Sequence, residues 1–230
     1  MRHQAMFVVL AWLAAIGTAF AAVSTAEAKR LQRAAEVVRA MRAQADKGIP
    51  EKLWGSAECV VVIPGLKKAA LGIGGEFGRG VMNCRNGGRW SAPVFMQLAK
   101  GSWGFQIGAA EIDLVLLVMN RDGAEKLLKD KVSLGVGASI AAGPVGRAAT
   151  AATDAKLTAE ILSYSRARGV FAGIDISGGV LSPDNDANTD AYGANVDPKE
   201  IVFGSVQPPP EAELLLEELR RQTVATTGVK

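Results

Sequence analysis

Histidine is nearly absent from this chain of 230 residues, because the only one is His3, close to the N-terminus. This scarcity excludes a Ser-His-Asp or Cys-His catalytic group and any site built from several histidine metal ligands. The sequence also has no Walker motif, no complete dinucleotide-binding glycine motif and no Gly-x-Ser-x-Gly or Ser-x-x-Lys nucleophile motif. Paired carboxylates stay open, since their pairing is spatial, but nothing in the sequence singles out a pair. We therefore expect a protein that is not an enzyme and has no cofactor.

Aromatic residues and charge are also limited. Aromatics make up 6% of the chain, and the formal net charge is +3. Neither value is typical of nucleic-acid-binding proteins, so we expect no nucleic-acid partner. The charge is unevenly distributed: residues 29–89 carry twelve Lys and Arg against five acids, and residues 175–230 carry four against ten. The basic character is therefore concentrated in the N-terminal third.

The first 28 residues have the pattern of an export signal. A short basic start precedes an apolar run over residues 5–23, and Ala19-Phe20-Ala21 and Ala26-Glu27-Ala28 both fit the small-x-small cleavage rule. An uncleaved membrane anchor is the alternative, since about nineteen mostly apolar residues can just span a bilayer. We expect a signal peptide over residues 1–28 and a periplasmic or secreted protein, in which peripheral association with a membrane is open.

Cysteine is scarce as well, with only Cys59 and Cys84, which stand 25 positions apart. In the oxidising compartment that export implies, two thiols in one small domain usually pair. The sequence contains no Cys-x-x-Cys redox motif. We predict a structural Cys59–Cys84 disulfide, with two buried free thiols as the alternative.

Glycine, in contrast, is abundant, with 26 residues against nine prolines. Many of these glycines alternate with apolar residues in three segments, over residues 71–81, 103–108 and 134–140. Strands of this kind have one face without side chains, which allows sharp coiling and close approach. We predict a single α+β domain over residues 29–207, with a curved, mostly antiparallel, glycine-rich and barrel-like sheet and peripheral helices. A proline-rich spacer and a helix follow over residues 208–230.

A basic amphipathic helix is predicted from residue 26 to about residue 47. Its apolar residues recur at steps of three and four, cations flank them, and Gly48 ends the pattern. A core-packing helix with a solvated face is one interpretation. The other is a helix that lies on an anionic membrane, because cations beside an apolar stripe suit such a surface. In that case the lipid-binding residues are Lys29, Arg30, Leu31, Arg33, Val38, Arg39, Met41 and Arg42.

An acidic segment, Asp184 to Asp190, has the 1, 3, 5 spacing of a calcium loop. However, Thr189 stands where the turn glycine belongs, and Asn195 stands where a bidentate glutamate belongs. The alternative is the capped start of a helix ending at Gly193. We therefore expect no metal site.

Several short motifs together resemble the SYLF lipid-binding family. In chain order they are Glu58–Pro64, Gly74–Gly80, Trp90–Pro93, Gly104–Gly108, Asp113–Asn120, Ala142–Arg147, Tyr164–Gly173, and Asn188 with Tyr192-Gly193. The resemblance covers about residues 30–205.

The resemblance implies a non-enzymatic domain that binds membrane lipids, with membrane contact through an N-terminal amphipathic segment. Because this chain begins with an export signal, we expect anionic phospholipids as the partner and do not expect actin. The alternative is a cell-envelope scaffold that binds a protein partner. Its contact surface would be the C-terminal helix with Leu214, Leu215, Leu216 and Leu219.

Overall fold

Two very long antiparallel strands organise the fold: β1 (Cys59–Asn86) and β3 (Val94–Val118). The structure is a computed structural model that describes residues 23–43, 48–144, 159–167, 170–173, 175–194 and 196–227. The strands pair from Cys59 opposite Val118 to Met82 opposite Val94. Gly87 and Gly88, both with positive φ, form a tight turn before β2 (Arg89–Trp90).

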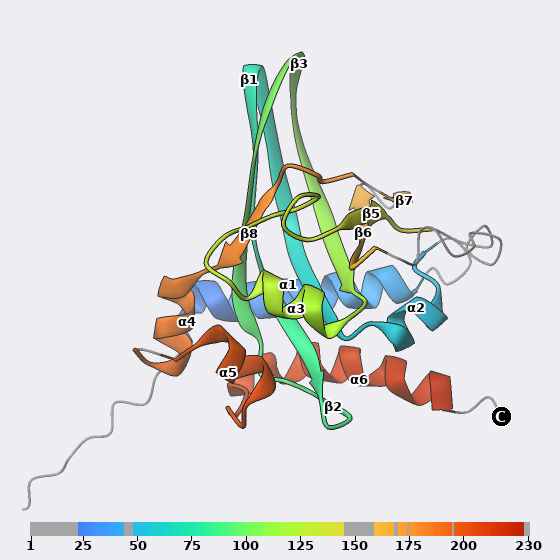
Figure 1. The fold of residues 1–230 in the computed structure, drawn as a ribbon, viewed down its shortest axis with the longest axis vertical. Helices are drawn as coiled ribbons and strands as arrows, with labels where there is room; N and C mark the ends of the chain where they lie inside the picture. Colours follow the sequence, from blue (N-terminus) through green and yellow to red (C-terminus); the bar gives the residue numbers. More distant parts are fainter. Residues whose placement is uncertain are drawn as a thin grey trace, which may run out of the picture.

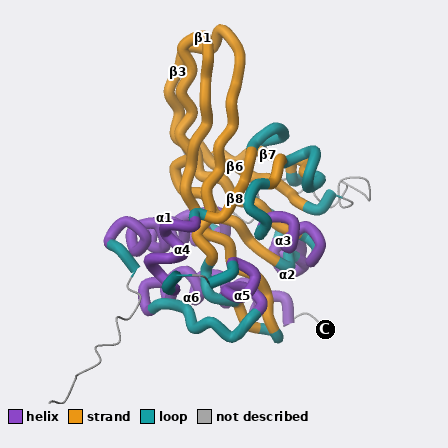
Figure 2. The backbone as a smooth tube through the Cα atoms, turned by 60° about the vertical axis from the view of Figure 1, so that its left-hand side comes forward, coloured by secondary structure: helices purple, strands orange, loops and turns teal. Residues whose placement is uncertain are grey.

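The paired strands fold over as one ribbon, so that β1 returns beside its own beginning (Figures 1 and 2). The Cα atoms of Cys59 and Cys84, 25 positions apart in one strand, lie only 4.0 Å apart. The register between β1 and β3 shifts between Ile63 and Leu66 and again between Ala70 and Gly72. Such irregularities let a strand bend, and the second of them lies at the end of the ribbon that projects beyond the helices.

Glycines allow the two halves of β1 to pack closely. A Cβ on Gly78 would lie 2.5 Å from Ile63 Cγ2, and one on Gly80 would lie 2.8 Å from Ile63 Cα and collide with the Val62 carbonyl oxygen. The side-chain-free face predicted for this segment is therefore used for close approach of backbone to backbone.

The remaining strands complete a curled sheet around the base of the ribbon. The last part of β3, residues 113–118, pairs with β6 (Ile161–Ala167). The first part of β3, residues 96–99, pairs with β8 (Val180–Pro183). Three short strands extend the sheet: β4 (Val132–Ser133), β5 (Ile140–Ala142) and β7 (Val170–Gly173). All described pairings between named strands are antiparallel except that of β5 with β6. The predicted fold class, a single α+β domain with a curved sheet, is confirmed.

Helices cover the base of the ribbon and leave its far end projecting (Figure 2). They are α1 (Thr25–Arg42), α2 (Glu51–Ser56), α3 (Arg121–Leu127), α4 (Asn185–Tyr192), α5 (Pro198–Phe203), the 3-10 turn η2 (Pro210–Ala212) and α6 (Glu213–Thr227). In β1, Val60 and Val62 belong to the core beneath α1 and α6, whereas Val61 and Ile63 belong to a second core with α3 and α5. Because side chains alternate along a strand, one apolar run supplies both cores.

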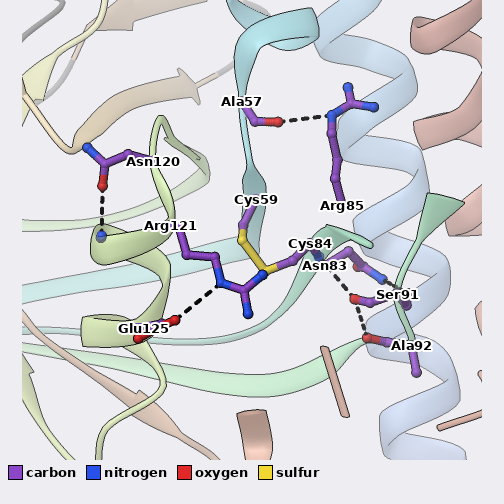
Figure 3. The surroundings of a disulfide bond; sticks show 11 residues. Ala57, Cys59, Asn83, Cys84, Arg85, Ser91, Ala92, Asn120, Arg121 and Glu125 are labelled. Atoms are coloured by element: carbon purple, nitrogen blue, oxygen red, sulfur yellow. Dashed lines mark hydrogen bonds and ion pairs between the residues drawn. A yellow bond between two sulfur atoms is a disulfide. The ribbon is translucent and has the colours of Figure 1, made fainter. Parts of the chain in front are cut away.

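The predicted disulfide is confirmed, and it joins the two ends of the folded-over β1 (Figure 3). Both cysteines are fully buried. Beside them, Ser91 Oγ accepts a hydrogen bond from the backbone N–H of Cys84 at 3.0 Å and donates to the Ala92 carbonyl oxygen at 2.8 Å. The base of the ribbon is thus fixed covalently and by buried hydrogen bonds.

Two sequence predictions differ from the structure. The third glycine-alternating segment, residues 134–140, is not a strand but mostly a turn, in which Gly135 takes a φ of +90°. The N-terminal helix ends at Arg42, and residues 44–47 of its predicted range lie outside the described part. Residues 1–22 of the expected signal peptide and residues 145–147 of one family motif also lie outside it.

Within the described ranges, none of the helices combines the length and apolar character that a membrane-spanning segment needs.

Candidate functional site

A basic cleft of 390 Å³ opens between α1 and the folded-over part of β1. Helix α1 contributes one wall, and two stretches of β1 around residues 65 and 78 contribute the other. The cleft is lined by five cations and one aromatic ring: Lys29, Arg30, Arg33, Lys67, Arg79 and Phe77. Phe77 is 47% exposed, which is unusual for a large apolar side chain of this protein.

Local structure explains how these residues meet. Ser24 caps α1, where its side chain and that of Glu27 form a reciprocal capping box that fixes the start of the helix. Positions 26, 29, 30 and 33 then fall on one face of the helix, at steps of three and four. In β1, Gly65 has a φ of +59° and donates its backbone N–H to Asp113 Oδ1 at 3.1 Å, which marks the irregularity beside the cleft.

Three of the five cations have acidic partners. Arg30, which is buried, donates to Asp184 Oδ2 at 3.0 Å, and Arg79 Nε lies 3.7 Å from the same oxygen. Arg33 lies 2.8 Å from Glu111 of β3, with its side chain 45% exposed, and Arg30 also lies 3.9 Å from Glu27. These three acids hold the three guanidinium groups in place. The positive balance of the cleft therefore comes from the two lysines.

The two lysines of the cleft differ from the arginines. Lys29 and Lys67 are both exposed. No acid in the described ranges forms an ion pair with either of them. Their ammonium groups are therefore free to bind an anion, and each one presents three N–H donors.

The sequence-predicted lipid-binding residues divide into separate groups. Lys29, Arg30 and Arg33 line the cleft. Leu31, Val38 and Met41, in contrast, are fully buried in the core beneath α1. The apolar stripe of the helix faces the sheet, because burying it there stabilises the fold in the ordinary way. The expectation that this stripe rests on a membrane must therefore be corrected: in this fold the three side chains have no exposed surface.

Arg39 and Arg42 lie outside the cleft. Arg39 donates two hydrogen bonds to Glu218 of α6, at 2.9 and 2.7 Å, and Glu218 is itself buried. Arg42 lies 3.1 Å from Glu51 at the start of α2. Both arginines connect α1 to neighbouring helices, which is a structural role.

Sequence reasoning missed Lys67, Phe77 and Arg79. The sequence contains only a weak signal for these three residues, because charged and aromatic residues are common in strands and do not by themselves indicate a site. Only the return of β1 brings residues 67 and 77–79 to the same place beside α1. The Lys67-Lys68 pair after Pro64-Gly65 was the one local sign of a basic strand end.

The family's closing motif is also structural. Asn188 accepts a hydrogen bond from the Phe95 N–H at 2.8 Å and donates to the Phe95 carbonyl at 3.0 Å, which attaches α4 to β3. Tyr192 donates its hydroxyl to the Pro93 carbonyl oxygen at 2.6 Å, and burial raises the pKa of this phenol. The acidic segment begins α4, as the helix interpretation predicts. The expected cap is not formed, because the Asp184 side chain makes no cap hydrogen bond and instead accepts one from Arg30. Among the described residues, no cluster of three or more His, Cys, Asp or Glu is placed to hold a metal ion.

Taken together, the fold and the cleft define a single α+β domain with a concave basic surface at the foot of a folded-over β-ribbon. Comparison with known proteins identifies the family. The model of the Ysc84 family, described as a Las17-binding protein actin regulator, matches residues 99–222. The chain therefore belongs to the Ysc84 family, whose domain is the SYLF domain.

Individual relatives agree with this assignment. The chain is 32% identical over 179 residues to LAS seventeen-binding protein 3 of Saccharomyces cerevisiae, covering 76% of this chain and 39% of the relative. It is 31% identical over 180 residues to SH3 domain-containing YSC84-like protein 1 of Mus musculus, covering 77% of this chain and 53% of the relative. The chain thus spans about half or less of the length of these relatives, whose names refer to binding and to SH3 domains.

Proposed function

We propose that this protein is an exported, non-catalytic membrane-binding domain that binds anionic phospholipid through the basic cleft. The observation that carries the proposal is the gathering of Lys29, Arg33, Lys67 and Arg79 around one concave surface. Phosphate and carboxylate headgroups match such a set, because guanidinium groups bind phosphate in a bidentate manner and ammonium groups act as point charges. The exposed ring of Phe77 supplies an apolar contact beside these charges.

The position of α1 changes how the helix would contribute. With its apolar stripe buried, α1 would bind lipid through the cations of its first turns and would remain packed on the sheet. This mode costs no core contacts, whereas laying the helix on a membrane would expose Leu31, Val38 and Met41.

Vesicle flotation tests the proposal. Neutralising both free lysines, Lys29→Gln with Lys67→Gln, is expected to weaken binding to anionic vesicles by about 2 kcal/mol, roughly 30-fold, because each cation near such a surface contributes about 1 kcal/mol. Lys52→Gln with Lys129→Gln is the matched control, since these exposed lysines carry the same charge and lie outside the cleft. An equal loss in the two pairs, or equal binding of the unaltered chain to neutral vesicles, would contradict the cleft as the site.

The structure also helps to choose between the two cleavage sites that the sequence allows. Cleavage after Ala28 would remove the cap Ser24 and the buried Glu27 from α1, whereas cleavage after Ala21 would leave both in place. Loss of such a cap costs about 1 kcal/mol. We therefore expect Ala22 to be the first residue of the exported protein, measured by mass spectrometry of its N-terminal peptide. A mature chain that begins at Lys29 would contradict this expectation.

A protein partner in the cell envelope is the second candidate, favoured by the relatives whose names describe them as LAS seventeen-binding. The surface first expected for it is largely unavailable, because Leu215, Leu216 and Leu219 are buried and only Leu214 is 38% exposed. Deleting residues 208–230 would therefore remove core side chains as well as any docking surface. A partner that is still bound by the Lys29 and Lys67 double variant, after vesicle binding is lost, would establish this second function separately.

A further inference from the structure

A second cleft, of 580 Å³, lies beside β2 and α6, at the opposite end of the molecule from the projecting ribbon (Figure 1). One wall is the hairpin turn with β2, the second is the segment between α5 and η2, and the third is α6. We call it the hairpin cleft. Its volume is in the range of ligand-binding pockets. None of the described residues that line it also lines the basic cleft, so the two sites are separate.

The first wall contains an open strand edge at Trp90. In the hairpin, Trp90 stands opposite Arg85. The Ser91 N–H donates to the Cys84 carbonyl, whereas the Arg85 N–H donates to the Glu58 carbonyl, outside the hairpin. Opposite residues of an antiparallel pair alternately exchange two hydrogen bonds and none, so Arg85 and Trp90 exchange none. The N–H and C=O of Trp90 therefore point away from β1.

These two groups have no backbone partner within the described part of the chain. Trp90 is nevertheless only 8% exposed, and its ring is covered by the Arg85 guanidinium, which lies 4.4 Å from the ring centroid. Buried backbone polar groups are nearly always paired in proteins. The open edge at Trp90 is thus suited to an additional strand.

The second wall, residues 204–209, is extended. It leads from α5, which packs in the second core, to α6, which packs in the first, so it crosses from one face of the sheet to the other beside β2. Pro209 has a φ of −65° and a ψ of 152°, which is extended backbone. A residue before a proline is restricted to such conformations, and this applies to Gln207 and Pro208.

This wall also has open backbone groups. The Asn86 side chain donates to the carbonyl oxygens of Phe203 and Gly204, both at 3.0 Å, and so attaches the start of the wall to the hairpin turn. Over residues 205–207, no backbone N–H or C=O forms a backbone hydrogen bond with another described residue. The hairpin cleft is therefore bordered on two sides by extended chain with unpaired donors and acceptors.

Charge does not select the occupant of the hairpin cleft. Three cations and three acids line it or stand next to its walls: Arg85, Arg89, Arg220, Glu200, Glu211 and Glu213. Because the two signs balance, the cleft offers no particular attraction to a polyanion or a charged lipid surface. Each wall instead contributes one apolar side chain, from Trp90, Val206 and Leu216. Open backbone groups beside apolar side chains are the requirements for binding an extended peptide.

The structure assigns the hairpin cleft as a docking site for an extended segment of a protein partner, which adds a strand to the open edge of β2. Backbone hydrogen bonds to Trp90 hold the segment, and its apolar side chains pack between the walls. A second copy of this chain is not the occupant, because two copies of one concave site are not complementary to each other. The inference is independent of membrane binding, and it gives the second candidate function a surface in place of the buried leucines of α6.

Peptide selection on the purified full chain tests the assignment. From a phage-displayed library of random short peptides, we expect enriched sequences with apolar residues at alternate positions, because one face of an added strand meets the walls. A synthetic peptide of an enriched sequence is expected to slow hydrogen exchange of the Trp90 N–H by about tenfold or more, since that group then donates to the peptide. A library in which no peptide is enriched, or unchanged exchange at Trp90, would overturn the inference.

Methylation of the peptide backbone distinguishes strand addition from binding by side chains alone. An N-methyl group at the residue that pairs with the Trp90 carbonyl removes one hydrogen bond and blocks close approach of the strand, so affinity is expected to fall by about tenfold. Equal affinity for every singly methylated form of the peptide would show that the edge of β2 is not used.

Ser205→Trp tests the location of the site. Ser205 is an exposed residue of the second wall, and a large side chain there is expected to fill the hairpin cleft and weaken peptide binding by about tenfold or more. Ser56→Trp is the matched control, because Ser56 is also exposed and lies at the end of α2, outside the cleft. Thermal unfolding shows whether both variants keep the fold, and the exchange measurement at Trp90 needs no variant.

The outcomes separate this site from the basic cleft and from self-association. Peptide binding that is lost in Lys29→Gln with Lys67→Gln but kept in Ser205→Trp would assign the peptide to the basic cleft and overturn the inference. Self-association that Ser205→Trp abolishes, without any enriched peptide, would assign the hairpin cleft to a second copy and also overturn it. Vesicle binding should be unchanged by Ser205→Trp, so that failure of either proposal leaves the other in place.

Discussion

Gly80→Ala is expected to destabilise the fold by about 3 kcal/mol, at the upper end of the range for overpacked interiors. The added methyl group would collide with the carbonyl oxygen of Val62 and lie 2.8 Å from Ile63 Cα. Both obstacles are backbone atoms of the same strand after it has folded over, so no side chain can rotate to make room. For a domain of this size, the unfolding midpoint should fall by about 6–12 °C.

Gly75→Ala is the matched control for this prediction. The two glycines lie five positions apart in β1, but a Cβ on Gly75 would meet only the Lys100 carbonyl oxygen, at an ordinary 3.8 Å. Its effect on the free energy of unfolding should stay within about 0.5 kcal/mol, as for most surface substitutions. Differential scanning calorimetry of the two variants measures the contrast. Equal unfolding midpoints would show that the halves of β1 are not packed as closely as described.

Local sequence signals predicted the elements that depend on local chemistry. The spacing of apolar residues at steps of three and four predicted α1. The residues Asn86-Gly87-Gly88 are typical of a tight turn, and Asn120 and Asp122 are both typical of a helix cap. Of these two, Asn120 forms the cap, because its side chain accepts a hydrogen bond from the Gly123 N–H at 2.8 Å. Each of these features is determined within about four residues, so the sequence contains the full cause.

The return of β1 depends on contacts far apart in the sequence and was not predicted. Alternating glycines indicated a face without side chains, but not which backbone would approach it. The same pattern over residues 134–140 produced a turn, because Gly135 adopts a positive φ that a strand does not use. Alternation of glycine alone therefore cannot distinguish a close-packed strand from a chain reversal.

The candidate site was predicted in part for the same reason. Helix α1 and its cations were visible as a local pattern, whereas the second wall of the cleft exists only because residues 65–67 and 77–79 meet after the fold-over. The burial of Leu31, Val38 and Met41 also depends on that sheet. An amphipathic helix does not reveal from its own sequence whether its apolar stripe faces a core or a membrane.

Removal of the disulfide is expected to cost about 3.5 kcal/mol, because it closes a loop of 25 residues and restricts the unfolded chain accordingly. Cys59→Ala with Cys84→Ala tests this prediction without leaving an unpaired thiol. The two sulfur atoms lie in the second core, so the small apolar replacements avoid burying a new polar group. Unfolding in urea measures the free energy of both forms.

The bond should matter locally as well as globally, because it joins the start of β1 to the segment that returns beside it. Hydrogen exchange is therefore expected to rise most in β1 near residues 59–63 and 80–84, and little in α4, which is attached to β3 by Asn188. Reduction of the unaltered chain during unfolding should reproduce the loss of stability, while the same reductant should not change the double variant. If the reduced and oxidised chains unfold at the same urea concentration, the disulfide does not hold the ribbon closed, and its fold-over must be maintained by Gly78, Gly80 and the two cores alone.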